Sequence, residues 1–302
     1  MQRIYITIIL SWWGIVFAAD KEDLDVQRIL VPTLRSILVA TDIPLDNIQT
    51  NKQVYSKITS YMQVIKNIYC ERGFKSFFQG TFPRLGINFI RSGYQFTFFK
   101  DIPLYIQNSE KFSYFPKNLA VSFSIAAADT VFINGLEFWK VRRMTNLSFQ
   151  KHVSSPIKTL EYLTRGGLST FSGNLISWSI FLELEERLRK HLKSRAGDEK
   201  LHFKDYLLVG SITGVIDSLA TTPFYNIKNQ QQAWGAGAKT FREAIKLIGN
   251  QKGIKGFYAG FFLDYFRTLV FCSFDVWARD LAEHKGSLGG IQPQTPQSSE
   301  PL

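Results

Sequence analysis

Residues 223–260 begin with PFYNIKNQ, at 223–230, and end with GIKGFYAG, at 253–260. An apolar segment at 206–222 leads into this stretch, and a second apolar segment starts at Phe261. Between them lie basic and amide residues, a short amphipathic piece and a glycine turn. Apolar segments of this length on both sides of a polar connection predict a hairpin of two membrane-length helices.

The chain contains this arrangement three times. The opening signature occurs as PLDNIQ at 44–49, GLEFWK at 135–140 and PFYNIK at 223–228, so its copies start 91 and 88 residues apart. The glycine turn occurs as GFKSFFQG at 73–80, GGLSTFSG at 166–173 and GIKGFYAG at 253–260. From signature to final glycine the spacing is 36, 38 and 37 residues. Two motifs in a fixed order and at near-constant spacing predict three tandem repeats.

This pattern resembles the mitochondrial carrier family, whose three repeats carry P-x-[DE]-x-x-[KR] followed by [DE]-G-x4-[aromatic]-[KR]-G. The resemblance covers about residues 25–285 and is a divergent one. It implies an all-α membrane protein of three tandem repeats, with six kinked transmembrane helices and three short matrix-side helices. The predicted parts are an extra apolar segment at 1–25, repeats at 26–112, 113–200 and 201–285, and a disordered tail at 286–302.

The expected elements follow from the hydrophobic pattern within each repeat. Long helices are predicted at 26–51, 81–107, 119–144, from Asn174 onward, 204–231 and 261–282, and short surface helices at 55–70, 156–164 and 239–250. Residues 4–19 are apolar and fit either a retained membrane-embedded helix or a cleaved signal sequence, and we favour the retained helix.

Composition limits the class of protein. The mean hydropathy of −0.06 agrees with amphipathic helices around a polar cavity, and the aromatic content of 15% suits lipid-facing surfaces. The net charge of +11 fits either a solvated basic face or attraction of anionic solutes and lipids. Nucleic-acid binding is not expected, because the basic residues follow helix ends and form no single stripe. Cys70 and Cys272 are too few for a disulfide framework.

The resemblance gives the opening signatures a role as a matrix gate. Kinks at Pro44, Gly135 and Pro223 would bring three helix ends together. In the family, the acid of one repeat then pairs with the base of the next. The implied links are Asp46 with Lys140, Glu137 with Lys228, and a neutral link between Tyr225 and Gln49. Both departures from the family's charges fall on that third link, so no buried charge is left alone.

Two further sets of residues are implied by the resemblance. The helix starts after the turn glycines would hold cardiolipin phosphates, at Gly80, Gly173 and Gly260 with Gly235 and Gly237, although plain turn glycines are the alternative. The solute would contact Asn88, Arg91, Ile180, Arg267 and Thr268. Arg267 is the strongest expected anchor for a carboxylate or phosphate of the solute, with contact to a helix C-terminus or a lipid phosphate as the alternative.

The family's second gate, on the intermembrane side, is not recognisable. Its positions hold Lys100 with Pro103 and Asp280 with Glu283, which form no acid–base ring. Two functions therefore compete. The first is transport of a small anionic solute across the mitochondrial inner membrane by alternating access. The second is a transport-inactive structural subunit of a larger inner-membrane complex, such as a respiratory complex.

No enzymatic activity is expected. The four histidines, His152, His191, His202 and His284, form no cluster, and no nucleophile stands at catalytic spacing from a base. No metal or cofactor is predicted. Bound cardiolipin and other membrane lipids are the expected partners besides the solute.

Overall fold

The computed structural model describes residues 26–55, 60–108, 116–147, 161, 163–196, 201–233 and 240–288. These residues form helices and turns and contain no strand, so the all-α prediction is confirmed for this part of the chain. The extra apolar segment at 1–25 and most of the predicted tail, 289–302, lie outside the described residues.

The helices follow one another in an order that repeats long and short elements. They are α2 (Val26–Val54), α3 (Tyr61–Arg72), η1 (Phe74–Phe78), α4 (Thr81–Asn108), α5 (Lys117–Ala128), the π-helical segment η3 (Asp129–Ile133), α6 (Asn134–Met144), α8 (Gly167–Ala196), α9 (Phe203–Gln232), α10 (Phe241–Lys252), α11 (Ile254–Phe257) and α12 (Phe261–Leu288). Because η3 continues directly from α5 into α6, residues 117–144 form one long helical stretch.

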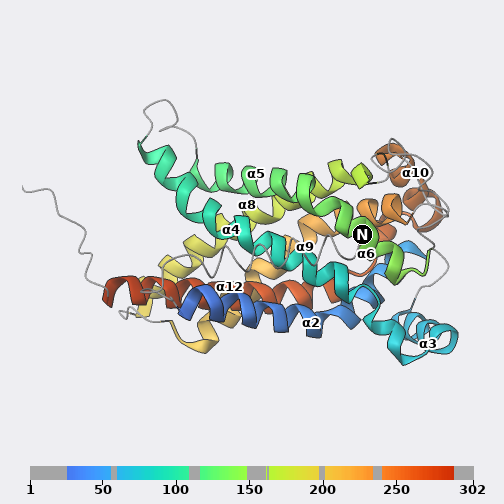
Figure 1. The fold of residues 1–302 in the computed structure, drawn as a ribbon, viewed down its shortest axis with the longest axis horizontal. Coiled ribbons are helices and arrows are strands. Elements are labelled where there is room, and N and C mark those ends of the chain that lie inside the picture. Colours follow the sequence, from blue (N-terminus) through green and yellow to red (C-terminus); the bar gives the residue numbers. More distant parts are fainter. Residues whose placement is uncertain are drawn as a thin grey trace, which may run out of the picture.

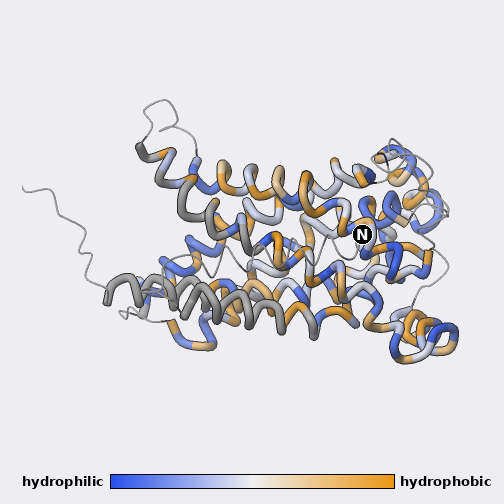
Figure 2. The backbone as a smooth tube through the Cα atoms, viewed as in Figure 1, coloured by the Kyte–Doolittle hydropathy of each residue, from blue (hydrophilic) through white to orange (hydrophobic). Residues whose placement is uncertain are grey.

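The long helices close into a ring. Contacts link α2 to α4, α4 to α5, α5 to α8, α8 to α9, α9 to α12, and α12 back to α2. In Figure 1 these helices lie side by side along the long axis of the molecule, with α3 and α10 at the same end. A ring of this kind leaves its middle to the side chains that each helix points inward, and Figure 2 shows hydrophobic and hydrophilic residues interspersed along the helices.

Five of the six predicted long helices agree with the structure to within a few residues at most ends, but the fourth does not. We predicted a helix from Asn174 onward, whereas α8 begins at Gly167. Gly166 adopts a positive φ of 75°, a conformation that glycine reaches without the steric cost of a Cβ, so the chain turns there. Gly73 and Gly253 turn in the same way, with φ values of 74° and 61°, but there a second positive-φ glycine follows, at Gly80 or Gly260. Gly173 is helical instead, so α8 runs on from Gly167 without a second turn. The predicted surface helix at 156–164 falls largely outside the described residues.

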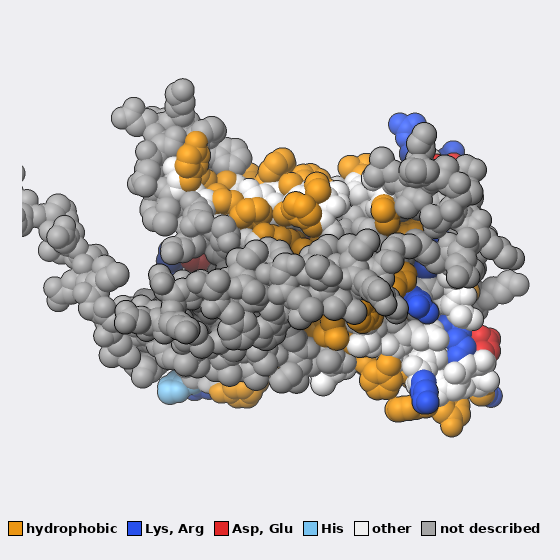
Figure 3. Space-filling model, viewed as in Figure 1, with side chains coloured by type: hydrophobic (Ala, Val, Ile, Leu, Met, Phe, Trp, Pro, Cys, Tyr) orange, Lys and Arg blue, Asp and Glu red, His pale blue; other side chains and the backbone are white. Residues whose placement is uncertain are grey.

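Two helical stretches in the described residues, Lys117–Met144 and Phe203–Gln232, are long and apolar enough to cross a membrane. Hydrophobic side chains gather on the outside over α5 (Figure 3), where Phe123 is 54% exposed and Phe132, in η3, is 61% exposed. Six transmembrane helices stay a prediction, because hydropathy alone supports two.

Helices α9 and α12 approach each other more closely than they could if Gly210 and Gly214 carried side chains. A Cβ atom on Gly210 would lie 2.8 Å from the backbone nitrogen of Ser273 and 3.0 Å from the carbonyl oxygen of Leu269. One on Gly214 would lie 3.1 Å from the backbone nitrogen of Leu269. The two glycines, one turn apart on α9, therefore let the two backbones touch.

The predicted kink positions all lie within continuous helix. Pro44 is inside α2, Pro223 is inside α9, and Gly135 is in α6 directly after the π-helical segment η3. Proline and π-helical turns are both recognised causes of bending. The kinks themselves stay a prediction.

Candidate solute cavity and its closing network

A cavity of about 220 Å³ lies inside the ring of long helices. Side chains from α2, α4, α6, α8, α9 and α12 line it, and many of them are charged. Among the lining residues, the bases are Arg84, Arg91, Lys140, Lys228 and Arg267, and the acids are Asp46, Glu137, Asp217, Asp264 and Asp275. A buried space with this many ionisable groups can recognise a small polar solute.

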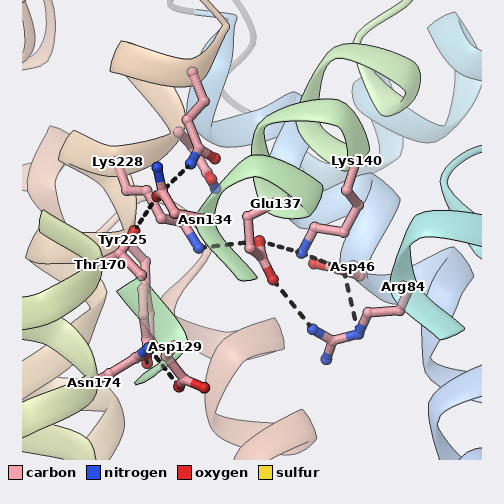
Figure 4. Close-up of polar contacts among 12 residues, drawn as sticks. Asp46, Arg84, Asp129, Asn134, Glu137, Lys140, Thr170, Asn174, Tyr225 and Lys228 are labelled. Atoms are coloured by element: carbon pink, nitrogen blue, oxygen red, sulfur yellow. Dashed lines mark hydrogen bonds and ion pairs between the residues drawn. The ribbon is translucent and has the colours of Figure 1, made fainter. Parts of the chain in front are cut away.

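Buried ion pairs join three helices beside the cavity. Lys140 Nζ of α6 lies 3.0 Å from Asp46 Oδ2 of α2 and 2.9 Å from Glu137 Oε2. Lys228 Nζ of α9 lies 3.2 Å from the same Glu137 oxygen. Figure 4 shows these side chains converging from their separate helices. The two ion pairs that the sequence predicted are therefore present.

Arg84 of α4 adds a third base to this cluster, and the sequence analysis missed it. Its guanidinium lies 3.8 Å from Glu137 Oε1, 3.9 Å from Asp46 Oδ2 and 3.5 Å from Asp42 Oδ2. The only sequence signal is an arginine four residues after Gly80, outside both repeated motifs. We call Asp46, Arg84, Glu137, Lys140 and Lys228 the closing network.

The predicted link between Tyr225 and Gln49 is wrong. Gln49 Nε2 instead donates to Asp264 Oδ1 of α12 at 3.0 Å, and its Oε1 accepts from Arg267. The Tyr225 hydroxyl lies 3.4 Å from Asn174 Oδ1 of α8. The amide of Gln49 is thus satisfied by α12, which lies against α2.

Neutral amides join α2 to α9 about one turn beyond the predicted link. Gln230 Nε2 donates to the backbone oxygen of Gln53 at 2.7 Å and to that of Val54 at 3.1 Å. The side chain of Asn229 donates to Gln53 Oε1. This junction is uncharged, and neither residue of the predicted link takes part in it.

Arg267, the predicted solute anchor, lines the cavity and binds the protein's own carboxylates. Its Nε and Nη2 atoms lie 2.6 and 2.8 Å from the two oxygens of Asp42, and its Nη1 lies 3.2 Å from Asp46 Oδ1. A guanidinium and a carboxylate in this parallel arrangement form a strong, oriented pair. A solute can reach the guanidinium fork only by replacing Asp42.

Arg91 is bound in the same way on the other side of the cavity. Its Nε and Nη2 atoms lie 3.1 and 2.9 Å from the two oxygens of Asp129 in η3. Asn174 Nδ2 donates to Asp129 Oδ2 at 2.7 Å, and the Tyr94 hydroxyl donates to the other oxygen. Asp129 is therefore fully engaged, which holds the π-helical segment to both α4 and α8.

A protein-family model described as "mitochondrial carrier protein" matches residues 37–110 and 199–285, which is more than half of the chain. The chain belongs to the mitochondrial carrier family. Members of this family are transporters and normally lie in the inner mitochondrial membrane. The matched segments fall on the first and third predicted repeats. No curated protein matches the chain.

The family's expected solute contacts fall on the cavity wall with one exception. Asn88 and Thr268 line the cavity, as Arg91 and Arg267 do, but Ile180 is not among the lining residues. On α8 the lining positions are Asn174, Ser177, Trp178 and Phe181. This spacing of three, four and seven residues defines one helix face, and Ile180 points off that face. Phe181, the residue after Ile180, does line the cavity, and a solute contact at Ile180 stays a prediction.

The carrier family's turn glycines divide into two kinds in this chain. Gly80 and Gly260 have φ values of 92° and 88° and stand directly before α4 and α12. Gly173 lies inside α8, so the N–H groups that follow it are not at a helix start. The predicted anion site at Gly173 is wrong for that reason. Gly235 and Gly237 lie outside the described residues, and lipid binding at Gly80 and Gly260 stays a prediction.

Two asparagines that the motifs did not single out attach the signature helices to the glycine turns. Asn47 Nδ2 donates to the backbone oxygens of Ser76 and Gln79 at 2.9 and 3.3 Å. Asn226 Nδ2 donates to those of Phe257 and Ala259 at 2.8 and 3.0 Å. The signal was visible in the sequence, since PLDNIQ and PFYNIK share Asn-Ile at the same place.

The family's second gate falls mostly on residues whose side chains are outside the described part of the chain, namely Lys100, Asp280 and Glu283. Pro103 lies inside α4. The absence of an acid–base ring at this end stays a prediction.

Proposed function

We propose that this protein transports a small solute across the mitochondrial inner membrane by alternating access. One observation carries the proposal: the closing network joins α2, α4, α6 and α9 through buried ion pairs at the wall of the cavity. Ion pairs suit a closure that must break and re-form, because their attraction is offset by the hydration that the charges regain on opening. Membership of a transporter family supports the same reading.

The proposed architecture is three repeats with six kinked transmembrane helices and matrix-side surface helices. In support, Asn47 and Asn226 attach the signature helices to the turns that precede α4 and α12. The surface helices α3 and α10 lie at one end of the ring (Figure 1). If that end faces the matrix, as in the family, the ion pairs belong to a matrix-closed conformation.

The proposed solute is a small anion that competes with Asp42 for Arg267. A solute carboxylate or phosphate offers the same two-oxygen edge to the guanidinium as Asp42 does. An anion that replaces Asp42 removes one of the contacts between α12 and α2, and it competes with Asp46 for the same guanidinium. Binding would thus weaken the network that closes the cavity.

Uptake into liposomes tests this role, with labelled inorganic phosphate, succinate and citrate as probes. We expect Arg267→Lys to lower the uptake of the transported probe at least tenfold, because lysine has no fork for bidentate binding. Arg187→Lys is the matched control, since Arg187 forms an exposed pair with Glu183 on α8. Unchanged uptake by Arg267→Lys together with a lower melting temperature would make Arg267 a structural residue.

A transport-inactive structural subunit is the second candidate. It is favoured by the state of Arg91 and Arg267, since the protein's own carboxylates already hold both expected anchors. Native gels of gently solubilised membranes separate the candidates. Migration with a larger complex and no exchange of any probe would support the subunit. Migration as a monomer with exchange after reconstitution would support the transporter.

Cardiolipin is a proposed structural partner at the starts of α4 and α12, after Gly80 and Gly260. The N–H groups of a helix start attract phosphate, and both glycines hold the chain in the turn that exposes them.

A further inference from the structure

Asp217 of α9 is a buried acid that forms no ion pair with the bases of the closing network. Its side chain lines the cavity, and only 5% of the residue surface is exposed. Its Oδ1 atom has no hydrogen-bond partner. No ion pair of Asp217 occurs among the described residues. It therefore differs from the other acids of the wall that bind Arg or Lys.

The bases around the cavity are all engaged with other carboxylates. Arg84, Lys140 and Lys228 belong to the closing network, Arg91 binds Asp129, and Arg267 binds Asp42 and Asp46. Asp264, on the facing helix α12, accepts from Gln49 and from the Thr222 hydroxyl, the latter at 3.1 Å. The Oδ1 atom of Asp217 thus has neither an ion pair nor a hydrogen bond.

The surroundings of Asp217 offer more acids than free bases. The ionisable groups that face the cavity are Tyr225 and Lys228 on its own helix α9, Asp264, Arg267 and Asp275 on α12, Asp46 on α2, Glu137 and Lys140 on α6, and Arg84 and Arg91 on α4, while the lining residues of α8 are Asn174, Ser177, Trp178 and Phe181. No group of acids, cysteines or histidines in the described residues is arranged to hold a metal ion. A proton is the smallest cation that can neutralise an enclosed carboxylate.

We propose that Asp217 binds a proton in this closed conformation and releases it when the cavity opens. Ser177 of α8 hydrogen-bonds to the Asp217 carboxyl, but no cation among the described residues balances its charge. An ionised carboxylate with no cation beside it and one oxygen unbonded is strongly disfavoured in a buried site, so the group takes up a proton and becomes a neutral acid. When the closing network separates, water enters and hydrates the carboxylate, which favours the ionised form. On one side of the membrane the Asp217 carboxylate takes up H⁺ and becomes –COOH, and on the other side the –COOH loses H⁺ and becomes –COO⁻ again. One proton would then cross with each anionic solute.

This inference rests on the proposed transport function for its coupling, but the protonation state of Asp217 can be measured without transport. Infrared difference spectra of purified protein at neutral pH should contain a carbonyl band of a protonated carboxylic acid. We expect Asp217→Asn to remove that band. Asp205→Asn is the matched control, because Asp205 lies on the same helix and accepts a hydrogen bond from the backbone nitrogen of His202 at 2.9 Å. Survival of the band in Asp217→Asn would overturn the inference.

Stability gives a second measurement. Asparagine has the shape of the protonated acid, so Asp217→Asn should leave the melting temperature unchanged or raise it. Two results would indicate a metal cation at the site and overturn the proposal that it holds a proton. One is a lower melting temperature in Asp217→Asn. The other is a higher melting temperature of the wild type when sodium chloride replaces choline chloride.

Coupling is then tested in liposomes with labelled phosphate, succinate and citrate and an imposed pH gradient. We expect an acidic outside to increase uptake by the wild type several-fold and to have no effect on Asp217→Asn. A gradient response that persists in Asp217→Asn overturns the coupling. If the wild type moves no probe, the proposed transport function fails, and the infrared band still decides whether Asp217 holds a proton.

Discussion

The middle third of the chain, residues 113–200, is built differently from the two outer thirds. The outer thirds carry proline in their signatures, have positive-φ glycines directly before α4 and α12, and are matched by the carrier family model. The middle third has Gly135 after a π-helical segment and Gly173 inside a helix, and it lies outside the matched segments. Even so, it supplies both Glu137 and Lys140 to the closing network.

The difference shows that ion pairs of this kind form in the middle third although its backbone around the signature differs from that of the outer thirds. In the outer thirds, Asn47 and Asn226 attach the signature helix to the glycine turn. The middle third has Phe138 at that place, and Asn134, one turn earlier, donates to the backbone oxygens of Leu163 and Arg165 instead. In the middle third these carbonyls lie before the first glycine of the motif, Gly166, whereas in the outer thirds they lie between the motif's first and last glycines. The ion pairs form all the same, because they depend on the inner face of α6, which the different position of these carbonyls leaves in place.

The largest effect is expected where the middle third meets its neighbours. Lys140→Ala removes the cation shared by Asp46 and Glu137, and we expect a loss of about 3 kcal/mol, since breaking a buried ion pair leaves charges uncompensated. Asp46→Ala should cost about as much. The double variant should cost less than the sum by about 1–2 kcal/mol. Thermal-shift measurements in lipid-containing detergent test this.

The control for this prediction is Lys190→Ala, which breaks an exposed pair with Glu186 on α8 and should change stability by less than about 0.5 kcal/mol. Strictly additive effects of Lys140→Ala and Asp46→Ala would mean that the pair does not couple α6 to α2.

The asparagine contacts provide the next test. Asn226→Ala and Asn134→Ala each remove two hydrogen bonds to turn carbonyls, and each should cost about 2 kcal/mol. Phe138→Asn places an asparagine in the middle third where the outer thirds have one. It should not rescue Asn134→Ala, because in the middle third the bonded carbonyls lie at a different place in the motif. Rescue in a thermal-shift assay would mean that the three turns are equivalent after all.

The smallest effects are expected at the turn glycines. Gly260→Ala forces a residue with a Cβ into positive φ and also crowds Gln49 Cγ at 3.0 Å, so we expect a loss of about 1–2 kcal/mol. Gly173→Ala should be within about 0.5 kcal/mol of the wild type, since the gain in helix propensity offsets the contact with Tyr225 at 3.2 Å. Equal losses at both positions, measured by thermal shift, would remove the distinction between the thirds.

The sequence alone determined the helices, the polar interior and two ion pairs of the closing network. Helices follow from hydrophobic periodicity, and the pairing of Asp46 with Lys140 and of Glu137 with Lys228 was implied by the resemblance of the repeated signatures to those of the carrier family. Periodicity is a local property, so a chain read by itself reveals it. The start of α8 was mispredicted because the motif has glycine at its head, Gly166, and at its end, Gly173, and the chain turns only at the first.

Only the tertiary structure decided which inward-facing groups meet. It joined Arg267 to Asp42, Gln49 to Asp264 and Gln230 to the end of α2, and it left the Oδ1 atom of Asp217 without a hydrogen bond. The helical period determines which side chains point inward, but the partner of each depends on how closely two helices approach and how each is rotated. At α9 and α12 that approach is fixed by Gly210 and Gly214, whose missing side chains matter only once the facing backbone is in place.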